Sequence, residues 1–140
     1  MKQQCEKLPP RLEDYLETIY ILEKEVGVAR VKDIASERSV RMPTVSDVLK
    51  KLSERGFIDY EPYGTVKITL KGREYAQRLL QKHRVLEEFM REILKLPGEI
   101  AEVEGCLLEH HLGDETVERI GRLIEFIKGK GLMDELEKRY

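Results

Sequence analysis

The chain has 140 residues, of which 41% are hydrophobic and 37% are charged, with a net charge of −2, and this length suits one domain or two small domains that share a core. No apolar run approaches the roughly 18 residues that span a membrane, and the N-terminal MKQQCEKLPPR lacks the apolar segment of a signal peptide. We therefore expect a cytoplasmic protein with no membrane partner. The two cysteines, Cys5 and Cys106, are too few for a disulfide framework, and we expect no function for Cys5, which lies in a polar tail.

The charge is distributed unevenly along the chain. Residues 30–73 contain 10 basic and 6 acidic residues, a net charge of +4, whereas residues 1–29 contain 4 and 6 and residues 74–140 contain 11 and 15. A basic middle between acidic ends is typical of a protein in which only the middle segment meets phosphates. Chance variation among many surface charges is the alternative.

The first half of the chain has the pattern of helices followed by a hairpin. Apolar residues at helical spacing predict a helix over 10–26, which ends at Gly27, and a short helix over 31–38. Pro43 suits the first residue of a third helix that runs to about Arg55. Two β-rich runs follow over 57–61 and 65–70, joined around Pro62-Tyr63-Gly64, which predicts a hairpin.

The second half is predicted to be helical throughout. An amphipathic helix over 71–94 is broken by Pro97-Gly98, a second helix runs over 99–112, and Asp114 is predicted to cap a last long helix. No flexible linker separates the halves. We therefore predict domains at 1–72 and 73–140, with the boundary inside the long helix, so that the two are mechanically coupled.

The order helix, short helix, turn, helix and hairpin predicts a winged helix-turn-helix, whose recognition helix enters the major groove with its N-terminal residues towards the bases. Short hydroxyls there can reach phosphates or thymine edges, and the basic residues further along favour backbone contacts. Asp47 is unfavourable beside phosphates, but it can accept from a cytosine amino group. The alternative is a small helical unit for protein contacts. The predicted DNA-binding residues are Arg41, Pro43, Thr44, Ser46, Asp47, Lys50, Lys51 and, on the wing, Lys67.

The segment EGCLLEHHL places Cys106, Glu109 and His110 at positions i, i+3 and i+4, on one face of a helix. A thiol, a carboxylate and an imidazole together suit a transition metal. Taken singly, the other acidic and histidine pairs are more often solvated surface groups. Taken together, they supply enough donors for one or two sites of five or six ligands, which favours Fe(II), Mn(II) or Co(II) over a closed zinc site. These further candidate ligands are Asp14 with Glu17, His83 with Glu87, and Glu102 with Glu104.

Four segments resemble the diphtheria-toxin-repressor family of metal-activated transcription repressors, which includes the iron-dependent regulators and the manganese transport regulators. They are LEDYLETIYIL, RMPTVSDVLKKLSERGFI, KGREYAQRLLQKHRVLEEF and EGCLLEHHLGDETVERI, and they span nearly the whole chain. The resemblance implies a winged-helix domain followed by a helical metal-binding and dimerisation domain. It also implies homodimers on palindromic operators of metal-uptake genes. Because the sequence ends at Tyr140, we expect the two-domain form of the manganese branch, without the SH3-like domain of the iron branch.

The resemblance assigns the ligands unevenly between the two branches. Glu109, His110 and His83 match positions that both branches share. Cys106 matches the iron branch, where manganese regulators have a glutamate, whereas Asp14 and Glu17 match the manganese branch. Glu87 matches a ligand of the ancillary iron site, and Glu102 stands where that site has a histidine. This hybrid set weakly favours Fe(II), with Mn(II) close behind and Co(II), Ni(II) or Zn(II) as alternatives in vitro.

The sequence thus predicts a mainly α-helical protein with a small β-hairpin that acts as a dimeric, metal-activated repressor and not as an enzyme. A metal held by ligands of both domains would fix the spacing of the two recognition helices in the dimer. We expect residues 98–128 to form most of the dimer interface. The alternatives are a metal-indifferent winged-helix regulator and, with little support from the sequence, a metalloenzyme. The apolar residues predicted at the interface are Val103, Leu107, Leu108, Ile120, Leu123 and Ile124.

Overall fold

The computed structural model describes residues 7–62 and 64–140, so that Cys5 and Tyr63 lie outside the described residues. Packing divides the chain into two compact units, one up to Arg78 and one from Leu79 to Tyr140. The predicted fold class is confirmed, because the elements are helices apart from one antiparallel pair of strands. In the described part of the chain, no helix is long and apolar enough to cross a membrane.

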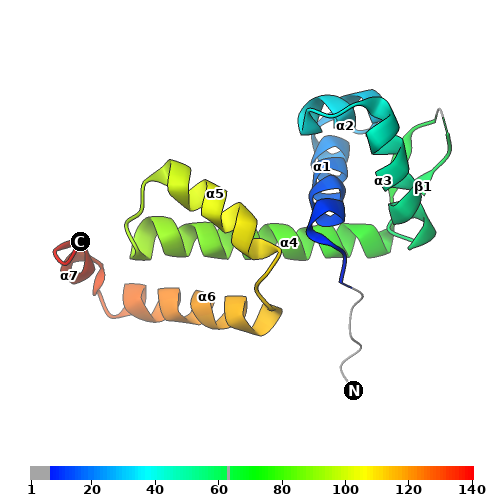
Figure 1. Ribbon diagram of the computed structural model, residues 1–140. Coiled ribbons are helices and arrows are strands. Elements are labelled where there is room, and N and C mark those ends of the chain that lie inside the picture. Colours follow the sequence, from blue (N-terminus) through cyan, green and yellow to red (C-terminus); the bar gives the residue numbers. More distant parts are fainter. Residues whose placement is uncertain (1–6, 63) are drawn as a thin grey trace, which may run out of the picture. The chain divides into compact units, whose positions relative to one another are not determined.

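The first unit contains three helices, a hairpin and the start of a long helix (Figure 1). The hairpin strands pair in register, with Ile58 opposite Ile68 and Tyr60 opposite Val66. Helix α2 packs against both α1 and α3, and the hairpin contacts α1 and α3. The order is that of the predicted winged helix-turn-helix. The elements are α1 (Pro10–Val26), α2 (Val31–Arg38), α3 (Met42–Glu54), β1 (Ile58–Tyr60), β2 (Val66–Ile68) and the first part of α4 (Leu70–Glu88).

Local sequence signals set the helix ends in this unit. Helix α1 ends at Gly27, which adopts φ 84°, a conformation that glycine tolerates without steric cost, and its N–H donates to the Glu23 carbonyl. The predicted bounds of α1 and α2 are confirmed. Helix α3 begins one residue earlier than predicted, with Pro43 still in its first turn. The strands are shorter than predicted, three residues each.

The core of the first unit also holds a buried polar contact. The Tyr75 hydroxyl donates to Oε2 of Glu13 over 2.8 Å and accepts the Leu8 N–H over 2.9 Å. Burial, reinforced by the Glu13 carboxylate, raises the pKa of Tyr75 well above its ordinary value. This contact ties the segment before α1 to α4. The largest fully buried apolar side chains of this unit include Leu16, Ile19, Ile34, Leu49, Leu52 and Phe57.

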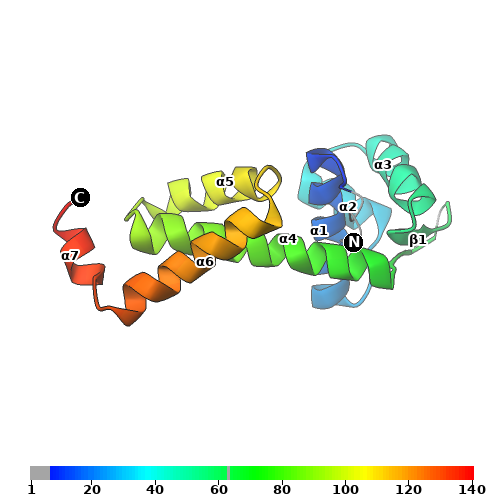
Figure 2. The same ribbon diagram turned by 90° about the horizontal axis from the view of Figure 1, so that it is seen from below.

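The second unit is built from helices alone. The end of α4 continues into a π-helical turn, η1 (Phe89–Ile93), followed by α5 (Gly98–Glu109), α6 (Asp114–Gly129) and α7 (Met133–Glu137). Helices α5 and α6 both pack against η1 and lie along the C-terminal half of α4 (Figures 1 and 2). The π-helical turn and α7 were not predicted from the sequence.

Two details of the second unit correct the predictions. Helix α5 ends at Glu109, so His110 occupies the position that ends the helix instead of lying within it. Gly113, not Asp114, occupies the N-cap of α6. Asp114 is the first helical residue, and its carboxylate lies 2.7 Å from Nζ of Lys82. A negative charge is favourable in the first turn of a helix, which explains why the sequence around Asp114 resembled that of an N-cap.

The second unit buries few large apolar side chains and leaves others exposed. Leu86, Met90, Ile93, Val117 and Ile124 are buried. Several apolar side chains on α5 and α6 are exposed instead, which leaves an apolar surface on these two helices. They are Ile100, Val103, Leu107, Leu123 and Phe126.

Candidate functional site

The Glu109 carboxylate is the centre of a cluster of candidate metal ligands in the second unit. Glu109 is only 1% exposed. Its Oε2 lies 3.5 Å from Nδ1 of His83. Its Oε1 lies 3.4 Å from Nε2 of His110 and 3.8 Å from Sγ of Cys106. One ligand atom from each of His83, Cys106 and Glu109 fits within 4.8 Å of the others.

The helix geometry explains how these side chains meet. Cys106 and Glu109 are three residues apart on α5 and therefore share a face. Gly105 of α5 lies against α4, where a Cβ on it would be 3.5 Å from the backbone nitrogen of Glu87, an ordinary van der Waals distance. This approach brings the α5 face to the level of His83, on the preceding turn of α4. His110 follows at the end of α5 and is 6% exposed.

The donors in this cluster fit a divalent transition metal. A carboxylate, two imidazoles and a thiol are the ligand types that borderline divalent ions accept. Burying a carboxylate is costly unless positive charge or hydrogen bonds compensate it. Within the described chain, Nδ1 of His83 is buried without a hydrogen-bond partner. A cation between His83 and Glu109 would use this nitrogen and neutralise the carboxylate.

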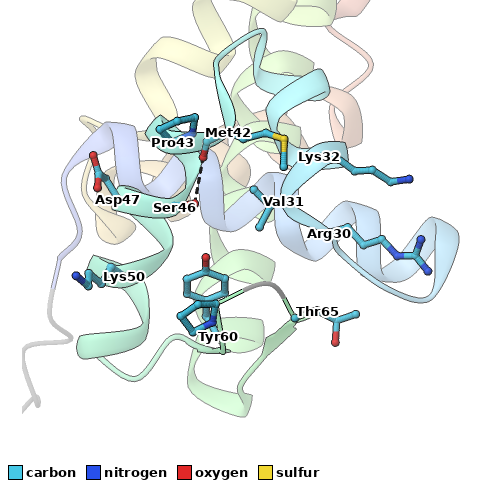
Figure 3. Close-up of a pocket in the computed structure, with 12 residues that line it drawn as sticks. Arg30, Val31, Lys32, Met42, Pro43, Ser46, Asp47, Lys50, Tyr60 and Thr65 are labelled. Carbon is cyan, nitrogen blue, oxygen red and sulfur yellow. Dashed lines mark hydrogen bonds between the residues drawn. The ribbon is translucent and has the colours of Figure 1, made fainter.

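A groove in the first unit lies between α3, the start of α2 and the hairpin (Figure 3). Its volume is about 820 Å³. Lys50 lies on one side, and Arg30 and Lys32 lie on the other. Cationic groups on both sides of an open groove suit a phosphate backbone. The lining residues are Arg30, Val31, Lys32, Met42, Pro43, Ser46, Asp47, Lys50, Tyr60, Pro62, Gly64 and Thr65.

Two family models cover almost the whole chain. Residues 7–66 match the N-terminal DNA-binding domain of iron-dependent repressors, and residues 69–130 match their metal-binding and dimerisation domain. The chain belongs to the iron-dependent repressor family. The two matches place it among the metal-dependent transcription repressors, as the resemblance to the diphtheria-toxin-repressor family predicted.

Several known proteins are similar to this chain. The chain is 42% identical over 120 residues to the HTH-type transcriptional regulator MntR of Geobacillus kaustophilus, which covers 85% of this chain and 84% of that protein. Among solved structures, the manganese regulator SloR aligns with a TM-score of 0.73 and 32% identity, and the IdeR protein of T. acidophilum aligns with 0.65 and 27%. Both alignments cover 85% of this chain. The chain spans about half the length of these two solved relatives, 55% and 53%.

The other predicted ligands of this repressor lie outside the group formed by His83, Cys106 and Glu109. Glu87 lies beside His83, with its Oε2 3.2 Å from Nε2 of the ring. Glu102 is exposed on α5. Asp14 and Glu17 are half-buried on α1 in the first unit, where Oδ2 of Asp14 lies 3.4 Å from Nη2 of Arg38. Cys106 is exposed, so it is not a core cysteine.

Part of the predicted DNA-binding set lines the groove of this repressor. Pro43, Ser46, Asp47 and Lys50 line it, and the Ser46 hydroxyl donates to the Met42 carbonyl over 3.2 Å. The other predicted residues are not among the lining residues: Arg41, Lys51 and Lys67 are exposed and Thr44 is half-buried.

Sequence reasoning missed the side of the groove formed by α2 and the hairpin. Arg30, Lys32, Tyr60 and Thr65 line this side, and Met42, the first residue of α3, is a further lining residue that was not predicted. The net charge of residues 30–73 already included Arg30 and Lys32, and this was the available signal. Only the fold, in which Ala29 just before α2 forms a bridge with Val66 of the hairpin, shows that these two cations belong to the same groove as Lys50.

Proposed function

We propose that this repressor binds palindromic operators of metal-uptake genes as a homodimer in the cytoplasm, and that Fe(II) or Mn(II) activates it. The observation that carries the proposal is the buried Glu109 carboxylate, held among two imidazoles and a thiol in a chain that also has a winged-helix groove. A regulator that did not respond to metal would have no need to bury a carboxylate among these donors.

In the proposed site, His83, Cys106, Glu109 and His110 are the ligands from the second unit. A bound cation supplies positive charge beside the Glu109 carboxylate and joins side chains that are far apart in sequence. Glu109 provides the negative charge, and Nδ1 of His83 provides an acceptor that has no other hydrogen bond among the described residues. Cys106 binds as a thiolate, which a nearby cation favours.

Asp14 and Glu17 are proposed as further ligands on the basis of the resemblance to the manganese branch. They belong to α1 of the DNA-binding unit. Ligands from both units would couple metal binding to the position of α3. Two recognition helices must lie about 34–36 Å apart to enter successive major grooves. Metal would then select this spacing from several that the metal-free dimer samples, by a shift of population.

The apolar surface of α5 and α6 supports the proposed homodimer. Val103, Leu107 and Leu123 are exposed, at 59%, 61% and 46%, and they were predicted to lie at the interface. Exposed apolar patches of this kind mark protein contacts. Ile124 was also predicted there, but it is 3% exposed within its own chain and is not available to a partner. Phe126, 57% exposed, is a better candidate.

The donor set bears on the choice between iron and manganese. The Cys106 thiolate is a softer donor than the carboxylates and favours Fe(II) or Co(II) over Mn(II). Two of the similar proteins are described as manganese regulators. We propose that both Fe(II) and Mn(II) activate the repressor, with Fe(II) favoured by Cys106.

A titration of DNA binding with each metal tests this proposal. DNA fragments are first selected from a random pool with the metal-loaded protein, and their binding to chelator-treated protein is then measured as Mn(II), or Fe(II) without oxygen, is added. We expect metal to tighten binding strongly in the parent, weakly in Glu109→Gln, and as in the parent in Glu125→Gln, which changes an exposed carboxylate on α6. Equal DNA affinity of the parent with and without metal would instead support a metal-indifferent regulator.

A further inference from the structure

His83 presents its two ring nitrogens to two different carboxylates. Nε2 lies 3.2 Å from Oε2 of Glu87, and Nδ1 lies 3.5 Å from Oε2 of Glu109. A neutral imidazole carries its proton on only one nitrogen, and the other nitrogen is then free to bind a metal. Nδ1 faces the Glu109 cluster and has no hydrogen-bond partner in the described part of the chain. A proton held on Nε2 by Glu87 would leave Nδ1 available to a metal.

Glu87 is itself held in place by a second contact. Its Oε1 lies 2.5 Å from Nη2 of Arg91. His83, Glu87 and Arg91 follow each other at intervals of four residues and so form a row along one face of the helix. Arg91 lies in the π-helical turn, and its guanidinium group lies against Gly98, where a Cβ would come within 3.3 Å of Nη1. The end of the row is thus packed against the start of α5.

We propose that Glu87 and Arg91 are positioning residues for the metal site: Arg91 orients Glu87, and Glu87 accepts the Nε2 proton of His83 so that Nδ1 is left unprotonated towards Cys106 and Glu109. This inference rests on the proposed function, since it assigns a role towards the same metal. Carboxylates that accept from a metal-bound histidine fix its tautomer and ring orientation, and their loss typically costs about 10- to 100-fold in metal affinity.

The geometry favours this role over direct ligation by Glu87. Both carboxylate oxygens of Glu87 are engaged, one with His83 and one with Arg91. Glu87 is also outside the group of described residues whose ligand atoms fit around one ion, whereas His83 is inside it. A direct ligand and a positioning residue make different predictions for the number of metal ions bound.

The test combines calorimetry with Mn(II) alone and nitrogen NMR of the His83 ring in the metal-free full chain at about pH 8, where an ordinary imidazole is neutral. In the parent we expect the tautomer with the proton on Nε2. Glu87→Ala should mix the tautomers and weaken Mn(II) binding about 10- to 100-fold without changing the number of ions bound. Glu87→Gln, whose carbonyl can still accept from Nε2, should keep the tautomer and most of the affinity. Arg91→Ala should lie between the two.

Glu115→Ala is the matched control. Glu115 pairs with Arg119 on α6 across the same four-residue interval, with 2.8 Å between Oε1 and Nη2, so its loss should leave both the tautomer and Mn(II) binding as in the parent. Loss of one bound ion in Glu87→Ala would show that Glu87 is a ligand. An unchanged tautomer and affinity in both Glu87→Ala and Arg91→Ala would also overturn the inference. A parent that binds no Mn(II) would refute the proposed metal site itself, which separates the two failures.

Discussion

The two units of the chain differ in how far they complete their own structures. The first closes a core around residues such as Leu16, Leu49 and Phe57 and satisfies its buried Glu13 with Tyr75. The second buries fewer large apolar side chains, exposes Leu107 and Phe126, and buries Glu109 among metal-binding donors. The first unit needs little beyond itself to fold, whereas the second has surfaces that suit a second copy and a metal ion. The proposed dimer contacts and most of the proposed metal ligands therefore lie in the second unit.

The largest expected effect compares one substitution made in each unit. Leu52 is fully buried in the first unit, and Leu107 is 61% exposed in the second. Leu52→Ala should lower the free energy of unfolding of the first unit by about 2–5 kcal/mol, because it leaves a cavity in a packed core. Leu107→Ala should leave the fold of the monomer intact and weaken the dimer. Thermal melts measure the stability of each variant, and sedimentation across protein concentrations measures its dimerisation. A dimer unaffected by Leu107→Ala would contradict the role given to the exposed apolar surface of the second unit.

A smaller effect is expected for the buried hydroxyl of the first unit. Tyr75→Phe leaves the buried Glu13 carboxylate without this donor, and a lost partner of a buried polar group costs about 1–3 kcal/mol. The stabilisation that the Tyr75 hydroxyl contributes also depends on pH. Because burial raises the pKa of Tyr75 above its ordinary value of 10.0, the tyrosine ionises more readily in the unfolded chain. Its contribution is fully present below about pH 10 and is lost as pH rises further.

Denaturant unfolding of the parent and Tyr75→Phe at about pH 8 and at higher pH measures this dependence. The difference in stability between the two should shrink as pH rises above about 10. A difference that grows with pH would mean that the tyrosinate is the form favoured in the folded state.

In the second unit, Cys106→Glu should change metal preference more than stability. Cys106 is exposed, so a glutamate there fits without overpacking, and it gives the manganese-branch pattern that the family resemblance supplies. Replacing the soft donor should shift the ratio of Fe(II) to Mn(II) activation towards Mn(II) by about tenfold, which corresponds to about 1.4 kcal/mol. Metal activation curves and melting temperatures of both proteins measure the change. A folded mutant with the parent's preference would remove Cys106 from the site.

The smallest expected effects separate two kinds of contact within the first unit. Lys50→Ala should weaken binding to all DNA sequences and reduce the salt dependence by about one counterion, as loss of a phosphate contact does. Ser46→Ala should instead narrow the difference between operator and random DNA. Both residues line the groove. Binding measured at several salt concentrations on both DNAs tests this, and identical behaviour of the two variants would mean that the recognition helix is wrongly placed on DNA.

Local sequence signals determined most of the helices, the hairpin and the shared face of Cys106 and Glu109. Apolar residues at helical spacing and Gly27 were enough to place α1, and the spacing of Cys106 and Glu109 was enough to place them on one face. These features depend on neighbours within about one helical turn, where backbone geometry alone fixes the outcome. The domain boundary and the complete set of ligands remain predictions.

Tertiary structure decided what depends on contacts between distant segments. The periodicity of α6 could not tell that Ile124 faces inwards while Leu123 and Phe126 face outwards, since all three are apolar. The meeting of Nδ1 of His83 with Glu109 depends on how closely α5 approaches α4 at Gly105. Sequence spacing restricts which residues can share a face, but the packing of one helix on another selects the face that is buried and the atoms that meet there.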